Sequence, residues 1–231
     1  TGFIRSGSAY LTGSDLSDYF SSSLTISEFE RKLASANGQF SVIIRRGREF
    51  WVAVDRIRNY PLFYMNTEDG WVISEDCYKL AALIPGKQLN PIAASSFLSS
   101  GFVTGRLTLI EDIFQVEAGS FVVLNDEAIS SFYHDSAAVP INDISISIAK
   151  TKLTSLIHDV FSSHFKALNN RFIAIPLSGG YDSRLVAAMC AKYHPGNVIC
   201  YTYGFRKSPE TALAKEAAER SGLNWVNIVY N

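Results

Sequence analysis

The sequence predicts a two-domain α/β protein, with a mixed α and β domain on an antiparallel sheet in its first half and a parallel sheet in its second. Up to about residue 135, short strand-like runs are broken at close intervals by turn-forming residues. After residue 146, apolar strand-like runs alternate with helical segments. Residues 135–146 contain proline and small residues without periodicity, which is typical of a linker. We therefore expect domains over residues 1–138 and 139–231.

The first half is expected to combine short strands with two helices. Residues 40–65 contain aromatic and β-branched runs separated by turn residues, which predict a hairpin followed by a third strand. A short helix capped by Ser74 is predicted over residues 75–84, and a second helix over residues 91–101. Residues 121–133 return to strand.

The second half is expected to form a parallel sheet. Apolar residues recur at helical spacing in residues 147–168 and predict a long amphipathic helix with its apolar face on a core. The segments that follow are a strand at 171–177, a helix from about 182 to 193, a strand at 198–205, a helix at 209–222 and a strand at 225–230. Near-continuous apolar strands separated by helices imply right-handed crossovers and a sheet covered on both faces. Ligands of such sheets lie beyond the carboxyl ends of the strands.

Charge and cysteine content exclude several classes of function. The 21 basic and 22 acidic residues give a net charge of -1, so we expect neither nucleic acid nor a membrane surface as a partner. No apolar run approaches the ~20 residues of a membrane span, and the start lacks a signal-peptide core, which predicts a cytoplasmic protein. The three cysteines form no CxxC pair and are expected to be small buried residues. The arginines at 45, 46 and 48 could form an anion site, although a charged hairpin tip is the commoner explanation.

The stretch PLSGGYDSR, residues 176–184, lies where a predicted strand ends and a helix begins. Gly179 and Gly180 remove side chains that would keep the backbone away from a ligand. The helix start presents N–H groups without intrahelical partners and a partial positive charge, so an anion is favoured there. The spacing is that of neither a Walker loop nor a GxGxxG motif.

Polar side chains in the same stretch extend this prediction to a magnesium nucleotide. Ser178 and Ser183 can add hydroxyl donors, whereas Asp182 would repel a phosphate unless a divalent cation lies between them. A plain turn at the glycines, with Asp182 or Ser183 as an ordinary helix cap, remains the alternative.

The segment SGGYDS resembles the SGGxDS pyrophosphate loop of the ATP pyrophosphatase (PP-loop) family, and its surroundings resemble asparagine synthetases. In the first half, GQFSVII, VDRIRNYPLFYM, SEDCYKLAALI and TLIEDIFQVEAGSFVVL follow segments of the glutaminase domain in order. In the second half, IPLSGGYDSR, TYGF and the spacing of Glu210, Ala214 and Ala218 follow the synthetase domain. The resemblance implies a glutaminase-like (Ntn-type) sheet domain over 1–138. It also implies the first part of a PP-loop domain, with the Rossmann-like fold of adenine nucleotide alpha hydrolases, over 139–231.

The resemblance implies ATP-dependent amide formation with Mg²⁺ as cofactor. A carboxylate, that of aspartate or an analogue, would attack the α-phosphorus of ATP, pyrophosphate would leave, and ammonia or an amine would displace AMP. Asp182 and Ser178 would be catalytic, with Asp182 holding the metal. By position, the nucleotide-binding residues would be Leu177, Ser178, Gly179, Gly180, Asp182, Ser183, Tyr203 and Gly204. Tyr203 is equally well explained as an aromatic residue at the edge of a core.

The sequence also departs from the family. The terminal cysteine nucleophile of the glutaminase is absent, and Thr1-Gly2 aligns with the family's Asn-Gly oxyanion segment, while Asp15 resembles the aspartate that binds the glutamine amino group. Arg184 stands where asparagine synthetases usually have serine, and Tyr181 where they prefer an aliphatic residue. These departures suggest a divergent branch, truncated at both ends.

Two other functions compete with the synthetase. One is a non-catalytic module of the same family that binds nucleotide or serves dimerisation. A homodimer is therefore a possible partner arrangement. The other is sulfur or nitrogen insertion into tRNA or a nucleobase by PP-loop enzymes, which the balanced charge and the lack of a paired-cysteine motif disfavour.

Overall fold

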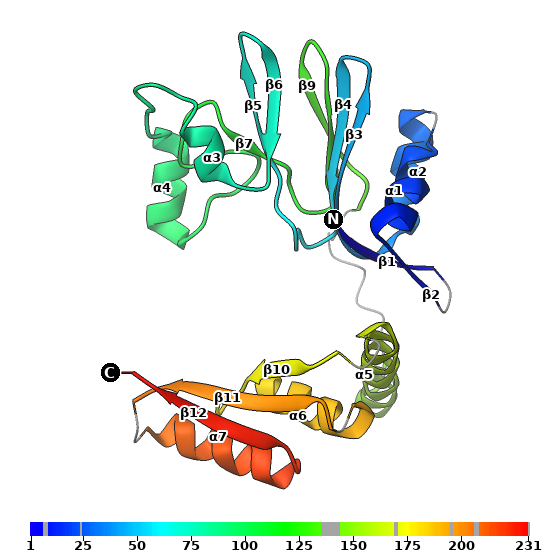
Figure 1. The fold of residues 1–231 in the computed structure, drawn as a ribbon, viewed down its shortest axis with the longest axis vertical. Coiled ribbons are helices and arrows are strands. Elements are labelled where there is room, and N and C mark those ends of the chain that lie inside the picture. The colour runs from blue at the N-terminus through cyan, green and yellow to red at the C-terminus, as the bar shows by residue number, and fades with distance from the viewer. Residues whose placement is uncertain are drawn as a thin grey trace. The chain divides into compact units, whose positions relative to one another are not determined.

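The computed structural model describes residues 1–6, 9–23, 25–134, 144–168, 171–194, 196–205 and 208–230. The chain divides into two compact units, Thr1–Val139 and Pro140–Asn231 (Figure 1). Most of the predicted linker, residues 135–143, lies outside the described residues. Each unit has its own hydrophobic clusters.

Two antiparallel sheets form the framework of the first unit. The six-stranded sheet has the order β2-β1-β3-β4-β8-β9 and the three-stranded sheet the order β6-β5-β7. The strands are β1 (Gly2–Ser6), β2 (Ala9–Thr12), β3 (Asn37–Arg46), β4 (Glu49–Val54), β5 (Phe63–Thr67), β6 (Gly70–Ser74), β7 (Phe114–Gln115), β8 (Ser120–Leu124) and β9 (Ala128–Phe132). The predicted hairpin, the third strand and the strands of residues 121–133 are confirmed.

The described residues of this unit form the helices α1 (Gly13–Ser21), α2 (Ile26–Ser35), α3 (Cys77–Ala81) and α4 (Pro91–Ser100). The helices α1 and α2 pack on the six-stranded sheet, and α3 packs on the three-stranded sheet. The predicted helix at 91–101 is confirmed, but the one at 75–84 is shorter than expected. Its N-cap is Asp76 rather than Ser74, because the Asp76 carboxylate accepts the N–H of Tyr78 at 2.8 Å. Ser74 instead accepts the N–H of Asp76 at 3.0 Å.

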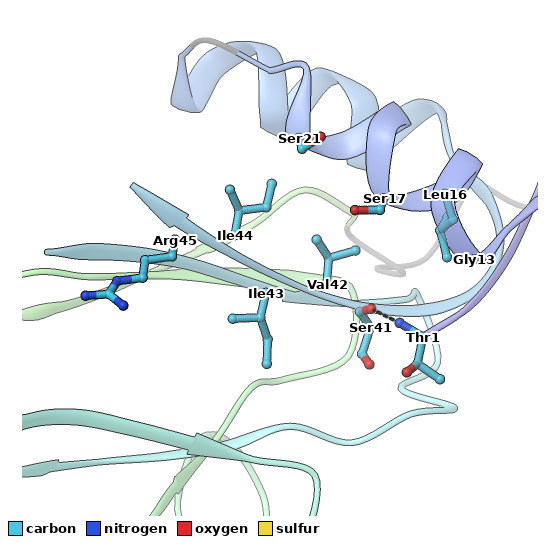
Figure 2. Close-up of a pocket in the computed structure, with 10 residues that line it drawn as sticks. All are labelled: Thr1, Gly13, Leu16, Ser17, Ser21, Ser41, Val42, Ile43, Ile44 and Arg45. Carbon is cyan, nitrogen blue, oxygen red and sulfur yellow. Dashed lines mark hydrogen bonds between the residues drawn. The ribbon is translucent and has the colours of Figure 1, made fainter. Parts of the chain in front are cut away.

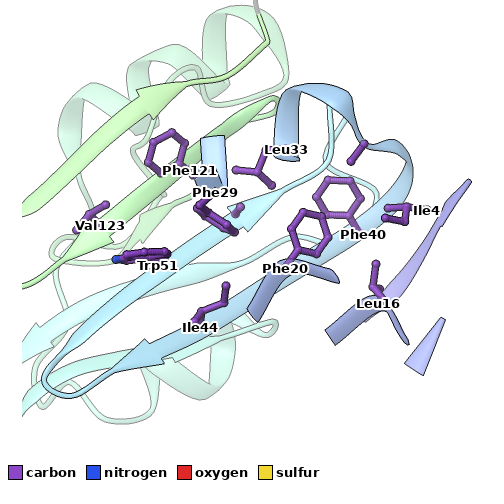
Figure 3. Packing of buried hydrophobic residues seen from close by; sticks show 12 residues of the cluster. Ile4, Leu16, Phe20, Phe29, Leu33, Phe40, Ile44, Trp51, Phe121 and Val123 are labelled. Carbon is purple, nitrogen blue, oxygen red and sulfur yellow. The ribbon is translucent and has the colours of Figure 1, made fainter. Parts of the chain in front are cut away.

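The core of the first unit follows the alternation of side chains along β4. Trp51 and Ala53 face α1 and α2, where the rings of Phe20, Phe29 and Phe40 are packed (Figure 3). The alternate residues of β4, Phe50, Val52 and Val54, pack against the three-stranded sheet. Both faces of the sheet are therefore buried along β4 and β8, which explains why these two strands are almost continuously apolar.

The second unit contains the predicted parallel sheet, in the order β10-β11-β12. Its elements are α5 (Ile146–Leu168), β10 (Ile173–Pro176), α6 (Tyr181–Tyr193), β11 (Val198–Gly204), α7 (Pro209–Arg220) and β12 (Asn224–Val229). The helix α7 begins at an N-cap, Ser208, whose hydroxyl accepts the N–H of Thr211 at 3.1 Å. Gly222, just beyond its end, has a φ of 66°.

The expectation that this sheet is covered on both faces is wrong for the described residues. Cys200 is buried beneath α6 and α7, whereas on the opposite face Tyr203 and Ile228 are 58% and 50% exposed. The strand order increases in one direction, so two right-handed crossovers place both helices on the same face. Figure 1 shows α6 and α7 on that common side.

The apolar stripe of α5 is also less buried than predicted. Its C-terminal part packs through Phe165, whose ring stacks on Tyr193 and His194. Farther toward the N-terminus, Leu153 and Leu156 are more than half exposed. The periodicity correctly predicts the helix, but the described residues bury only one end of its apolar face.

Candidate functional site

The predicted anion loop connects β10 to α6 at the carboxyl edge of the parallel sheet. Leu177 extends the sheet by one residue, because its N–H donates to the carbonyl of Tyr201 at 2.8 Å. Its own carbonyl accepts the hydroxyl of Thr202 at 2.7 Å. The Leu177 side chain belongs to the buried core of the second unit. The sheet therefore fixes the position at which the loop begins.

The two serines of the motif meet each other across the loop. The Oγ atoms of Ser178 and Ser183 lie 2.9 Å apart, and the N–H of Ser178 donates to Ser183 Oγ at 3.1 Å. The N–H of Gly180 donates to Ser178 Oγ at 3.2 Å. These bonds shape the loop, so a ligand that takes either hydroxyl must replace a contact within it.

The glycines have different local roles. A Cβ on Gly179 would lie 3.1 Å from Cδ1 of Leu213, so the missing side chain lets α7 approach the loop. Gly180 is the N-cap of α6 and provides no side-chain cap. The structure thus excludes Asp182 and Ser183 as N-caps, since both lie inside the first turn.

Asp182 is exposed in the first turn of α6, beside helix N–H groups that Gly180 leaves without a side-chain partner. A carboxylate at this position interacts favourably with the helix dipole and is free to hold a cation. The described residues contain no group of three or more His, Cys, Asp and Glu side chains that could hold a metal ion. A magnesium ion at Asp182 would therefore take its other ligands from phosphate oxygens and water.

Tyr203 and Gly204 end β11 on the same edge of the sheet. Gly204 has a φ of 143° and open space where a side chain would be, which fits the expected close approach of a ligand. The Tyr203 ring lies between those of Tyr201 and Tyr230, at 6.4 and 6.1 Å. Leu177, however, faces α6 and α7, whereas Tyr203 lies on the open face. The backbones of Leu177, Tyr203 and Gly204 therefore meet at one edge of the sheet. The side chains of Leu177 and Tyr203 lie on opposite faces.

The resemblance to the glutaminase domain concerns Thr1, Gly2 and Asp15, at the start of the chain. The amino group of Thr1 donates to the carbonyl of Ser41 at 2.9 Å, at one side of a cavity of about 330 Å³ (Figure 2). Gly2 is required by the sheet, since a Cβ there would lie 2.0 Å from the carbonyl oxygen of Gln39. Asp15 lies exposed in the first turn of α1. Thr1 and Gly2 are thus held by strand pairing with β3.

The arginine cluster at the first hairpin has structural contacts. Arg46 donates to the carbonyls of Ser21, the last residue of α1, and of Ser23, two residues farther along the chain. Arg45 donates to the carbonyl of Gly47 at 3.1 Å and covers the ring of Phe50. These contacts favour the charged hairpin tip over an anion site.

Sequence reasoning assigned no contact between Tyr181 and Arg184, and the structure places them together. The Arg184 guanidinium lies 4.6 Å from the centre of the Tyr181 ring, and Nε donates to the carbonyl of Gly180 at 3.2 Å. The spacing of three residues on a helix is the signal that could have revealed this pair.

The cysteines confirm the simpler expectation in the second unit. Cys190 and Cys200 are buried and free of disulfides. Burial, with a smaller effect of neighbouring Cys200, raises the pKa of Cys190 to about 11. A thiol with a raised pKa is a poor nucleophile, so neither residue extends the candidate site.

Among the described residues, no helix combines the length and apolarity that a bilayer crossing requires. Residues 167–231 match the family model described as Asparagine synthase. Over 209 residues the chain is 25% identical to a probable asparagine synthetase (glutamine-hydrolyzing) of Acanthamoeba polyphaga mimivirus, covering 87% of this chain and 36% of that protein. Over 204 residues it is 23% identical to the microcin J25-processing protein McjC of Escherichia coli, covering 86% and 37%.

The chain spans little more than a third of the length of these two relatives. Among solved structures, a glutamine phosphoribosylpyrophosphate amidotransferase from B. subtilis aligns with 93% of this chain and 38% of its own, at 15% identity. Its TM-score is 0.31, which supports no argument about fold.

Proposed function

The chain is an asparagine synthetase-like protein, and on that premise we propose that it serves ATP-dependent amide formation. In this reaction a substrate carboxylate is adenylated with release of pyrophosphate, and ammonia or an amine then displaces AMP. The similarity to an asparagine synthetase suggests aspartate or an analogue as the carboxylate. One relative is named for processing microcin J25, so the carboxylate in this branch need not be free aspartate.

The observation that best supports the proposal is the start of α6. A helix without a side-chain cap begins at the carboxyl edge of a parallel sheet and holds an exposed carboxylate, Asp182, in its first turn. N–H groups at such a position stabilise negative charge, which accumulates on pyrophosphate as it leaves. The arrangement fits an anion together with a divalent cation better than it fits either alone.

Roles follow from these positions. The first-turn N–H groups and the loop from Ser178 to Gly180 would hold the pyrophosphate, with Ser183 adding a hydroxyl. Asp182 would hold Mg²⁺, which neutralises phosphate charge when bound. Leu177, Tyr203 and Gly204 would lie beside the adenosine. Gly204 would let the ligand approach its backbone, because the space where a side chain would be is empty. We also propose that the protein acts in the cytoplasm as a homodimer. Neither nucleic acid nor a membrane is proposed as its partner.

The match to the asparagine synthase family favours a synthetase over a non-catalytic module.

The proposal is tested by measuring Mg-ATP binding to the chain by calorimetry, followed by ATP–pyrophosphate exchange with aspartate and other carboxylates. We expect Asp182→Ala to weaken Mg-ATP binding at least about tenfold, because a metal-binding carboxylate is lost. Exchange should be lost with it.

Asp159→Ala is the matched control, since Asp159 is an exposed carboxylate on another helix of the same unit, α5. It should bind Mg-ATP like the wild-type protein. Equal affinities for wild type and Asp182→Ala would contradict the proposed metal site. Binding without exchange for any carboxylate would instead favour the non-catalytic module.

A further inference from the structure

We propose that Arg184 is a positioning residue for the candidate anion site, where it fixes the peptide group between Gly180 and Tyr181. The inference rests on the proposed function, because it assigns a task to a side chain beside the same loop. It concerns a position at which the sequence departs from the asparagine synthetase pattern.

The contacts of Arg184 converge on the start of α6. Its Nε donates to the carbonyl of Gly180 at 3.2 Å, and its guanidinium lies 4.6 Å from the centre of the Tyr181 ring. The backbone N–H of Arg184 reaches the same carbonyl at 3.4 Å, which is long for a helical bond. The side chain thus reinforces a weak first hydrogen bond of the helix.

Acidic neighbours do not compete for the guanidinium. Arg184 lines a groove of about 260 Å³ between α6 and α7 together with Glu216 and Arg220. Glu216 is paired with Arg220 at 2.6 Å, and Arg184 forms no ion pair within the described part of the chain. Its charge is therefore held by the Gly180 carbonyl and the Tyr181 ring.

Peptide geometry links this contact to the anion site. In a trans peptide group the C=O and the N–H point in opposite directions. Arg184 holds the Gly180 carbonyl toward the body of α6, so the N–H of Tyr181 points out of the helix start, where an anion is favoured. Gly180 is the least restrained residue type and has no side chain to cap the helix. The Ser183 hydroxyl and the Arg184 backbone N–H also reach its carbonyl, both at 3.4 Å, so the bond from Arg184 Nε at 3.2 Å is the shortest of the three.

The charge of Arg184 points to the same ligand class. A cation near a helix N-terminus opposes the helix dipole, while Asp182 in the first turn interacts with the dipole favourably. An anion bound at the helix start would remove the unfavourable interaction. Arg184 is therefore explained by a pyrophosphate-like ligand better than by the stability of the helix alone.

The test uses the whole chain and inorganic pyrophosphate with Mg²⁺, measured by calorimetry. We expect Arg184→Met to weaken binding about tenfold, or about 1.4 kcal/mol, because the N–H of Tyr181 is no longer held toward the anion. Arg184→Lys should also lose affinity, because lysine keeps the charge but lacks the planar Nε donor. Tyr181→Leu should lose about two- to threefold, as the ring contact alone is removed.

Lys192→Met is the matched control, since Lys192 lies over the ring of Tyr193 at the other end of α6. It should bind pyrophosphate like the wild-type protein. Thermal unfolding should show that every variant is still folded at the temperature of the binding measurement, so that a lost affinity reports on the loop and not on unfolding. The amide NMR signal of Tyr181 without ligand should shift in Arg184→Met and not in Lys192→Met.

Wild-type affinity in Arg184→Met or in Arg184→Lys would overturn the inference, the latter by showing that charge alone is needed. An unchanged Tyr181 amide signal in Arg184→Met would overturn it as well. Failure of the wild-type protein to bind Mg-pyrophosphate is a distinct result, since it would overturn the proposed function and the inference with it.

Discussion

Asp55 is a buried carboxylate whose oxygens accept four hydrogen bonds. Its side chain is completely buried and accepts the backbone N–H groups of Phe40, Ile57 and Asn59 at 3.0 to 3.1 Å. The side-chain amide of Asn59 adds a fourth bond at 3.0 Å. The carboxylate therefore ties the segment after β4 to β3 and acts as a structural residue.

We expect Asp55→Ala to lower the free energy of unfolding by about 3 kcal/mol, because it leaves several donors without a partner. Asp55→Asn should cost less but remain destabilising, since an amide offers only one accepting oxygen. Urea unfolding measures both. Asp126→Ala, an exposed carboxylate in the same unit, should change stability by no more than about 0.5 kcal/mol. A similar loss in Asp126→Ala would contradict this account.

Residue-level prediction from sequence was uneven for physical reasons. The helix start at Ser208 and Pro209 was readable because capping is a local interaction. Asp55 was not, because its donors come from residues up to 15 positions away. The contact between Gly179 and Leu213 could not be predicted from the sequence either, because only the packing of α7 brings the two residues together.

At the level of elements, the loop between β10 and α6 depends on its contact with α7. A Cβ on Gly179 would lie 3.1 and 3.3 Å from two atoms of Leu213. Such distances are tighter than ordinary packing, so the loop or α7 must shift to admit a methyl group. The backbone of Gly179 itself is not in a left-handed conformation, so space rather than strain decides the outcome.

We expect Gly179→Ala to lower the free energy of unfolding by about 1 kcal/mol and to weaken Mg-ATP binding. Leu213→Ala removes the opposing atoms, so the double variant should recover much of both losses. A double-mutant cycle in urea unfolding and calorimetry measures the coupling. Additive effects of the two substitutions would show that the predicted contact does not constrain the loop.

Elements were predicted well where periodicity was enough and poorly where topology decided. The alternation after residue 146 correctly predicted the order of strands and helices in the parallel sheet. It did not predict that one face stays open, because that depends on the direction of successive crossovers. The helix α2 begins with a capping box, in which Thr25 and Glu28 exchange hydrogen bonds, and the spacing of these two residues is visible in the sequence.

At the scale of the whole molecule, buried thiols make stability depend on pH in the alkaline range. Burial, then the neighbouring Cys200, raises the pKa of Cys190 to about 11, above the ordinary value of 9.0. Because the folded state keeps its proton longer than the unfolded state, this contribution is fully present below about pH 9. It is lost as pH rises toward 11.

We therefore expect the free energy of unfolding to fall between pH 9 and pH 11, and to fall less steeply in Cys190→Ala. Urea unfolding at a series of pH values measures the two slopes. The substitution also lowers stability at neutral pH by removing buried atoms, so the slopes and not the absolute values are compared. Identical slopes would contradict a role for this thiol.

The open face of the parallel sheet has a practical consequence for handling the protein. Side chains such as Val226 and Ile228 meet solvent there at 45% and 50% exposure, on a type of sheet that is usually sealed on both sides. Water in contact with a flat aliphatic surface favours self-association. Concentrated samples should therefore aggregate through this surface. A mild detergent, or a polar substitution on this surface, should prevent the aggregation.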